Sequence, residues 1–514
     1  MRKIVKATLL VTLFSLVGQV VAFATQMVTA ALFGAGAGMD AFLAASAVPQ
    51  YVIAVLLGSL GFVFVPVFVD YLATGREDEA WRIASSVINL SLLVLGAMVA
   101  LGILFPDAIL GVTAPGLPDA IHRQAVQIAV ITWPSVLATG VVFLLSGIYQ
   151  SQSRFGWPAA VPVIGAIVNL GLVVALANWL GIIGLAIATT LGIVLQVGLL
   201  LPLALKKGSY RLTLDWRHPA VWQVLRLLLP LVLVSLVAKS TLLVDRYLAS
   251  GMPEGSISHL GYAFRIFIFI ILLVSTGITT VIFPRMAFDM AGSDLFGLRR
   301  TMSAGLRFMW LAIAPVIALG ITLALPMVTA VFKRGHFGAA DAVAVAGLLQ
   351  VYLLALAPAC LGNVTGRGFY VLKDTRTFAV LGSIESVAYV FYTIALARVW
   401  GVTGIVIGYV ILFNGSLAWQ VFIVRHKTGR TGGRTVLCSF ARTGLAAMLG
   451  GVAAWGVTTI FTNVWVQLVL GGTVGLGIYG ILLHELGSVE ARAMSKSIMD
   501  WIRLRYRKDL VSLG

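Results

Sequence analysis

The chain has 514 residues, of which 60% are hydrophobic and only 11% are charged, whereas soluble domains carry about 25% charged residues. Apolar runs of membrane-spanning length recur along the whole chain, which excludes a soluble protein and indicates a polytopic helical membrane protein. The net charge of +17 is spread among short loops, so it does not indicate a nucleic-acid-binding protein.

Taken in chain order, the apolar segments predict an all-α membrane protein with fourteen transmembrane helices. Each segment is long enough to cross a hydrocarbon core of about 30 Å as an α-helix. The segments cover residues 7–33, 41–71, 84–106, 125–149, 158–179, 181–204, 219–250, 257–288, 302–326, 341–366, 377–398, 401–424, 437–461 and 465–486. Lys and Arg collect in alternate loops, and the positive-inside rule therefore places both termini in the cytoplasm.

The second half of the chain repeats motifs of the first half. The segments 61–66, 147–149 and 181–184 match 279–284, 368–370 and 401–404, each at a separation of about 220 residues. A repeat of six helices preserves orientation, so it predicts two parallel six-helix lobes related by an axis along the membrane normal. We expect an N-lobe at 1–205, a C-lobe at 206–425, two additional helices at 426–487 and a basic amphipathic tail at 488–514 on the inner leaflet.

Motifs for catalysis or metal binding are missing from the sequence. There is no Walker A motif, no HExxH motif and no CxxC pair, so neither an ATP-driven enzyme nor a metal site is predicted. Cys360 and Cys438 both fall in apolar segments, where we expect small buried thiols. The two-lobe pattern favours a transporter that works by alternating access, without a bound cofactor.

Charged residues fall inside the predicted spans, where each charge costs roughly 2.5–3.5 kcal/mol on insertion scales, and five of them are candidate site residues. Lys239 and Arg246 lie two turns apart on one face of the seventh segment, and Arg265 lies in the eighth. One interpretation makes these cations the lining of a cavity for an anionic substrate; the other pairs them with Asp245 and Glu385 in structural salt bridges. Asp245 and Glu385 are also candidates for a coupling site, with Na⁺, H⁺ or the membrane potential as the driving force.

Five motifs together resemble the MurJ/MviN family of the multidrug/oligosaccharidyl-lipid/polysaccharide exporter superfamily. They are FGAGAGMDAF at 33–42, VTAPG at 112–116, GSISHLGYAFR at 255–265, FKRGHF at 332–337 and GFYVLKDTRT at 368–377. The resemblance implies fourteen helices, two lobes around a cationic cavity, and flipping of lipid II across the bacterial inner membrane. It also implies a groove at helices thirteen and fourteen for the lipid tail, and it adds Asp40 to Arg265 as a substrate-site residue.

The chain departs from the family pattern at charged positions, mostly in the first lobe. The helix-one Arg-Asp pair of the family is Thr25 and Gln26 here, and the acidic residue before Arg265 is Phe264. These departures leave alternatives open: a flippase for another lipid-linked oligosaccharide or exopolysaccharide with Lys239 as a replacement cation, a cation-coupled drug exporter, or a scaffold without transport. For each we expect a monomer in the bilayer without a nucleic-acid partner.

Overall fold

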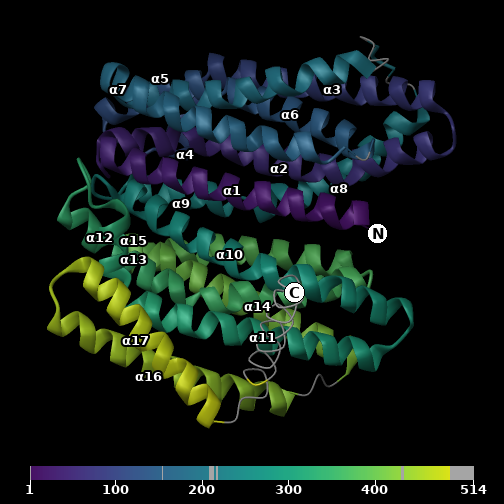
Figure 1. Ribbon diagram of the computed structural model, residues 1–514. Helices are drawn as coiled ribbons and strands as arrows, with labels where there is room; N and C mark the ends of the chain where they lie inside the picture. Colours follow the sequence, from purple (N-terminus) through teal and green to yellow (C-terminus); the bar gives the residue numbers. More distant parts are fainter. Residues whose placement is uncertain are drawn as a thin grey trace, which may run out of the picture. The chain divides into compact units, whose positions relative to one another are not determined.

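The computed structural model describes residues 2–152, 154–207, 213–215, 218–429, 433–486 and 492, and within these ranges the chain forms helices and no strand (Figure 1). An α-helix satisfies its backbone N–H and C=O groups internally, as a hydrocarbon environment requires. Except for Arg492, the predicted tail at 488–514 lies outside the described residues. The helices are α1 Arg2–Phe33, α2 Ala37–Ala73, α3 Glu77–Leu104, α4 Pro106–Thr113, α5 Asp119–Thr132, α6 Pro134–Ser151, α7 Gly156–Lys207, α8 Pro219–Ala238, α9 Thr241–Ser250, α10 Ser256–Ala291, α11 Leu295–Thr322, α12 Ala324–Phe332, α13 Ala339–Leu354, α14 Leu356–Val371, α15 Thr375–Thr428, α16 Gly433–Ile460 and α17 Val464–Glu485.

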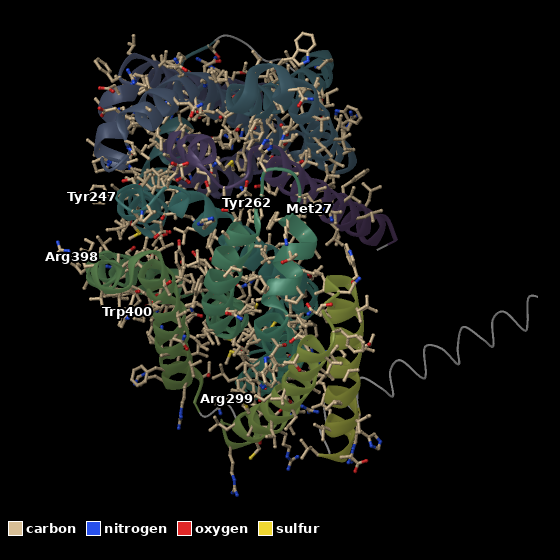
Figure 2. The ribbon with its side chains drawn as sticks, turned by 90° about the vertical axis from the view of Figure 1, so that its left-hand side faces the viewer. Met27, Tyr247, Tyr262, Arg299, Arg398 and Trp400 are labelled. Atoms are coloured by element: carbon tan, nitrogen blue, oxygen red, sulfur yellow. The ribbon has the colours of Figure 1, made fainter. Side chains whose placement is uncertain are left out.

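Membrane-spanning length is reached by eleven helical stretches of the described chain. The pair α13 and α14, bent by 41° at its break, makes a twelfth. Two of the eleven, α7 and α15, are interrupted at Gly181 and Gly401, where φ is 55° and 58° and ψ is −138° and −137°. Each of these long helices is therefore two helical segments joined at a glycine. In Figure 2, Arg398 and Trp400 lie beside the break in α15, and both side chains are exposed.

The order of elements over α1–α7 recurs over α8–α15. In each series a helix followed by a short helix (α3 and α4, then α11 and α12) precedes a broken pair and then a long helix with a glycine break. A Cβ on Gly184 would lie 2.6 Å from the Leu176 carbonyl oxygen, and a Cβ on Gly404 would lie 2.1 Å from that of Leu396. Because no side chain fits such an approach, the two matched Gly-x-x-Gly motifs have the same local structural cause.

Several predicted spans are broken where the sequence pattern predicted continuous helices. The predicted span 219–250 divides into α8 and α9, because the helix ends with the Lys239 N–H donating to the Ser235 carbonyl before a new helix begins at Thr241. The predicted span 125–149 breaks at Trp133, because Pro134 has no N–H with which to continue the helical hydrogen bonds. Local hydropathy does not predict either break, because the helical segments on both sides of each break are apolar.

The chain divides into two compact units. Unit 1 contains Met1–Gly261, Phe332–Asp341 and Ser386–Ile405, and unit 2 contains Tyr262–Val331, Ala342–Glu385 and Val406–Gly514. The predicted lobes at 1–205 and 206–425 follow the sequence repeat and stay a prediction. In unit 1, α2 packs against α5, α6 and α8, and its Phe68 meets Trp81 of α3 edge to face. In unit 2, α16 lies beside α17 and also packs against α11 (Figure 1).

Candidate functional site

Four of the five sequence motifs meet in unit 1 at what we call the loop junction, formed by residues 31–40, 114–116, 250–259 and 334–341. The His336 N–H donates to the Ala31 carbonyl at 2.9 Å, and the Ala37 N–H donates to Oε1 of Glu254 at 2.9 Å. The Gly116 N–H donates to Oγ of Ser250 at 3.1 Å. One backbone hydrogen bond and two hydrogen bonds from backbone to side chain therefore join segments that are far apart in the sequence.

Glycines make this close approach possible. Gly335 has a φ of 56°, and a Cβ there would lie 2.1 Å from the Ala31 carbonyl oxygen. Gly255 has a φ of 87°, and its Cβ would lie 2.6 Å from the Ala35 carbonyl oxygen. Any other residue at these positions would strain the backbone and force the loops apart.

Asp40 is the buried centre of the loop junction, with 3% of its surface exposed. Its Oδ2 accepts from the Gly255 N–H at 2.7 Å, and its Oδ1 accepts from the Ser258 N–H at 2.8 Å and from the Ser258 hydroxyl at 2.5 Å. The carboxylate thus caps the first turn of α10, where unpaired N–H groups favour a negative charge. In this state both oxygens are engaged by protein donors, and the predicted contact of Asp40 with substrate stays a prediction.

A histidine–carboxylate pair reinforces the junction. Nε2 of His259 lies 2.8 Å from Oδ1 of Asp341, and Oδ2 of Asp341 accepts from the Gly338 N–H at 2.9 Å. The pair ties the first turn of α10 to the first turn of α13. Sequence reasoning assigned neither residue to a site, because each falls at the end of a predicted span, where a side chain in contact with solvent is the ordinary expectation.

The charged residues of α8 and α9 have distinct surroundings in unit 1. Lys239 is exposed at the break between the two helices, and Arg246 is half-buried with Nη1 donating to the Ile257 carbonyl at 3.0 Å. Asp245 is buried and accepts a hydrogen bond from the Tyr389 hydroxyl at 2.6 Å. Arg246 therefore supports the start of α10, and whether it and Lys239 also bind substrate stays a prediction.

Glu385 belongs to unit 2 and has a partner of its own. Its Oε2 accepts from the Trp419 indole N–H at 3.2 Å, so it links the two segments of α15. The predicted role of Asp245 and Glu385 in ion coupling remains a prediction.

A cavity of about 490 Å³ opens in unit 2 between α10 and α14; it is lined by both polar and apolar side chains, and we call it the polar cavity. Four hydroxyl residues of α10 line it, namely Ser275, Thr276, Thr279 and Thr280. From α14 come Asn363, whose amide donates to Oγ of Ser275 at 3.3 Å, and Arg367, whose guanidinium lies 5.3 Å from the ring centroid of Phe283. Hydroxyls, an amide and a guanidinium are the groups that bind phosphate oxygens and sugar hydroxyls.

Two arginines, Arg265 of α10 and Arg367 of α14, lie on helix faces that line this cavity or continue its lining. Arg265 is exposed, and because it precedes Thr276 by three helical turns it lies on the face of α10 that lines the cavity. Arg367 was counted among the loop residues, since it follows the predicted span 341–366. The structure places it inside α14, one residue before the Gly-Phe-Tyr motif that marked the repeat.

An apolar groove lies on the neighbouring face of α10, also within unit 2. It has a volume of about 560 Å³ and is lined by Ile278 and Val281 of α10, by Phe308 of α11 and by Tyr479 and Leu483 of α17. The Tyr479 hydroxyl donates to the Leu311 carbonyl at 2.6 Å, which fixes α17 against α11. Thus α10 separates a cavity suited to a polar head group from a groove suited to a hydrocarbon chain.

In the part of the chain that the structure describes, no group of three or more His, Cys, Asp or Glu side chains could hold a metal ion. Cys360 is buried, as expected. The expectation for Cys438 is wrong: its thiol is exposed, because the start of α16 leaves a cavity beside it.

Comparisons with known proteins agree over most of the length. The family described as "Lipid II flippase MurJ" matches residues 29–472. A probable lipid II flippase MurJ of Vibrio cholerae is 25% identical over 515 residues, covering 94% of this chain and 95% of its own, and one of Bdellovibrio bacteriovorus is 29% identical over 432 residues, covering 81% of each. A solved structure of lipid II flippase MurJ in an inward closed conformation has a TM-score of 0.80 at 22% identity, covering 93% of this chain and 99% of its own. A MATE family multidrug transporter in an inward-facing conformation has a TM-score of 0.68 at 17% identity, covering 82% and 95% of the two chains.

Proposed function

This chain belongs to the lipid II flippase MurJ family, and from that premise we propose that it moves a polyprenyl-pyrophosphate-linked glycan, lipid II, across the bacterial inner membrane by alternating access. The observation that carries the proposal is the placement of α10 between a polar cavity and an apolar groove. Such a pair of sites suits a substrate with a charged head and a long hydrocarbon tail.

The proposed topology has fourteen spans. The stretches Gly156–Pro202 and Thr375–Thr428 have 47 and 54 residues, or about 70 and 80 Å of helix, which is more than twice the hydrocarbon thickness. Dividing each at its glycine break adds two spans to the twelve already described. An even number, together with the bias of Lys and Arg toward alternate loops, supports cytoplasmic termini and two parallel six-helix repeats followed by α16 and α17.

In this proposal the head group enters the polar cavity. The guanidinium of Arg367 offers a planar pair of donors to the diphosphate, while the α10 hydroxyls and Asn363 bind phosphate or sugar oxygens. Arg265 continues the same face of α10 and supplies a second positive charge. The hydrocarbon tail stays in the apolar groove beside α17, so the tail does not have to cross the polar face of α10.

The loop junction acts as the gate that closes one side in this proposal. With the termini proposed to be cytoplasmic, the turns after α1 and α9 would face the outer side, and the hydrogen bonds of the loop junction would hold that side closed. Opening must break the hydrogen bonds that Asp40 accepts from Gly255 and Ser258. Hydrogen bonds to charged groups contribute about 1.5–3 kcal/mol each, so substrate or ion binding has to offset a few kcal/mol. Asp245 and Glu385 remain the candidate groups through which Na⁺, H⁺ or the membrane potential supplies that energy.

One observation favours a second candidate, a flippase for a different lipid-linked glycan. Thr25 occupies a helix-one position at which the family resemblance implies an arginine, and it is buried with its hydroxyl donating to the Val21 carbonyl at 2.9 Å. The first half of the chain therefore offers no cation at that position. A head group that carries less negative charge than lipid II would suit such a site.

The test is flipping of lipid II by the purified protein in vesicles. We expect transport by the wild type, and strong loss in Arg367→Ala and in Arg265→Ala. Arg398→Ala is a matched control, because that arginine is exposed beside the break in α15 (Figure 2). Wild-type flipping by both cavity variants would remove the role assigned to the polar cavity. Failure of the chain to support growth of a strain depleted of its own lipid II flippase, with flipping of another lipid-linked glycan, would establish the second candidate.

A further inference from the structure

Unit 2 holds another cavity, away from both faces of α10 described above. It has a volume of about 760 Å³, within the range of about 300–1,000 Å³ that is typical of ligand sites. Its walls come from α11, α14, α15 and the first turns of α16. The lining residues are Leu306, Leu361, Leu417, Val421, Arg425, Gly433, Arg434, Thr435, Val436, Leu437, Cys438 and Phe440.

The charged residues that line this cavity are all positive. Arg425 and Arg434 are both exposed, and none of the described residues that line the cavity is acidic. A different cavity of unit 2, near the start of α11, provides the contrast: Arg285 and Arg300 there share the lining with Asp289 and Asp294. Only the first of these two cavities combines a net positive charge with an apolar wall, which its leucines, Val421 and Phe440 supply.

The walls are held in place by contacts outside the cavity. The Trp310 indole stacks on Phe440 at 4.9 Å between ring centroids and donates to the Phe440 carbonyl at 3.0 Å, which fixes α16 against α11. The Thr365 hydroxyl meets Oε1 of Gln420 at 2.5 Å, which fixes α15 against α14. The space is therefore built into the packing of four helices and does not depend on a ligand to form.

The arginine end of the cavity coincides with the end of α15. Arg425 accepts, through its carbonyl, the N–H of Gly429 at 2.8 Å. A Cβ on Gly429 would lie 2.7 Å from the Arg299 guanidinium, and Figure 2 shows Arg299 at one end of the unit 2 helices. Positive charge thus collects at the helix ends, and the apolar wall extends from there along α14 and α15.

We propose that this cavity binds one anionic phospholipid, with the phosphodiester held by Arg425 and Arg434 and an acyl chain lying on Leu417 and Val421. Basic pockets between transmembrane helices on the cytoplasmic side bind such head groups, whereas a zwitterionic lipid gains little from two arginines. The bound lipid would hold α16 against α15. Assignment to the inner leaflet rests on the orientation proposed above, but the binding itself does not.

The chain carries its own reporter for this site. Cys438 lines the cavity and is exposed, whereas Cys360 is buried. A maleimide should therefore alkylate Cys438 in the folded protein, and a lipid in the cavity should slow that reaction. Cys360 reports on folding, because its reaction with the reagent would indicate unfolded protein.

The experiment measures the rate of Cys438 alkylation in purified full-length protein with dioleoylphosphatidylglycerol, dioleoylphosphatidylcholine or inorganic phosphate added. Phosphatidylglycerol is expected to protect the thiol, and the other two additions are not. Arg425→Ala and Arg434→Ala should each weaken protection about five-fold, as expected for one cation near an anionic lipid. Arg300→Ala, in the charge-balanced cavity, should leave protection unchanged.

Three results would overturn the proposal. They are equal protection by phosphatidylcholine, protection by inorganic phosphate alone, and full protection by phosphatidylglycerol in the Arg425→Ala, Arg434→Ala double variant with Cys360 still unreactive. No lipid-linked glycan is present in this assay, so its outcome is independent of whether the protein flips lipid II.

Discussion

The loop junction makes a quantitative prediction for Asp40→Asn. The substitution keeps the size of the side chain but converts one of its two acceptor oxygens into an NH₂ group, which accepts no hydrogen bond. The asparagine side chain can then no longer accept at one oxygen from Gly255 and at the other from Ser258. One buried donor then loses its partner, which costs about 1–3 kcal/mol in the closed state. The ratio of open to closed protein should rise by about 5- to 150-fold.

Accessibility of a buried junction residue measures this shift. Ser256 is 6% exposed, and Ser256→Cys in a Cys438→Ser background gives one thiol that only opening uncovers. We expect a membrane-impermeant maleimide added from outside to alkylate it at least about five times faster when Asp40→Asn is present. Asp107→Asn is the control, because Asp107 is 81% exposed and pairs only locally with His122. Equal rates with and without Asp40→Asn, or the same acceleration by Asp107→Asn, would refute the gate.

Three more predictions concern single contacts. Gly335→Ala should destabilise the fold by at least about 1–2 kcal/mol, because φ is 56° and the new Cβ would meet the Ala31 carbonyl oxygen. Gly347→Ala is the control, since its Cβ would meet no neighbouring atom within 4 Å. Equal melting temperatures of the two variants would contradict this prediction. Tyr389→Phe should destabilise the protein by about 1–3 kcal/mol in chemical unfolding, since buried Asp245 loses a donor, and an unchanged midpoint would argue against it. The Lys427 ammonium and then the Thr377 hydroxyl hold the pKa of Asp374 below its usual 3.8, so the pair stabilises the fold above that pH and the effect is lost as pH falls through the lowered pKa. The melting-temperature difference between wild type and Asp374→Asn should therefore be constant near neutral pH and shrink in acid, and a difference that grew in acid would show the opposite sign.

The sequence by itself determined that the chain is an all-helical membrane protein, and it showed the matched Gly-x-x-Gly motifs; the fourteen-span count and the two lobes stay predictions. Hydropathy is a local property. An apolar window of sufficient length therefore predicts a span, whatever the rest of the protein packs against it. The glycines of the repeat were equally readable, because Gly181 and Gly401 have backbone angles that favour glycine whatever surrounds them. The motifs that carried the family resemblance were visible for the same reason, as short unbroken strings.

Only the tertiary structure decided what the charged residues contact. Asp40 reads as a possible substrate group, yet Gly255 and Ser258, more than 200 residues away in sequence, occupy its oxygens. Arg367 reads as a loop cation, yet α14 places it beside the hydroxyl face of α10. The physical reason is that a side chain's partner depends on which helices pack together, and that choice is made by contacts distant in sequence, which no local pattern of apolar and polar residues records.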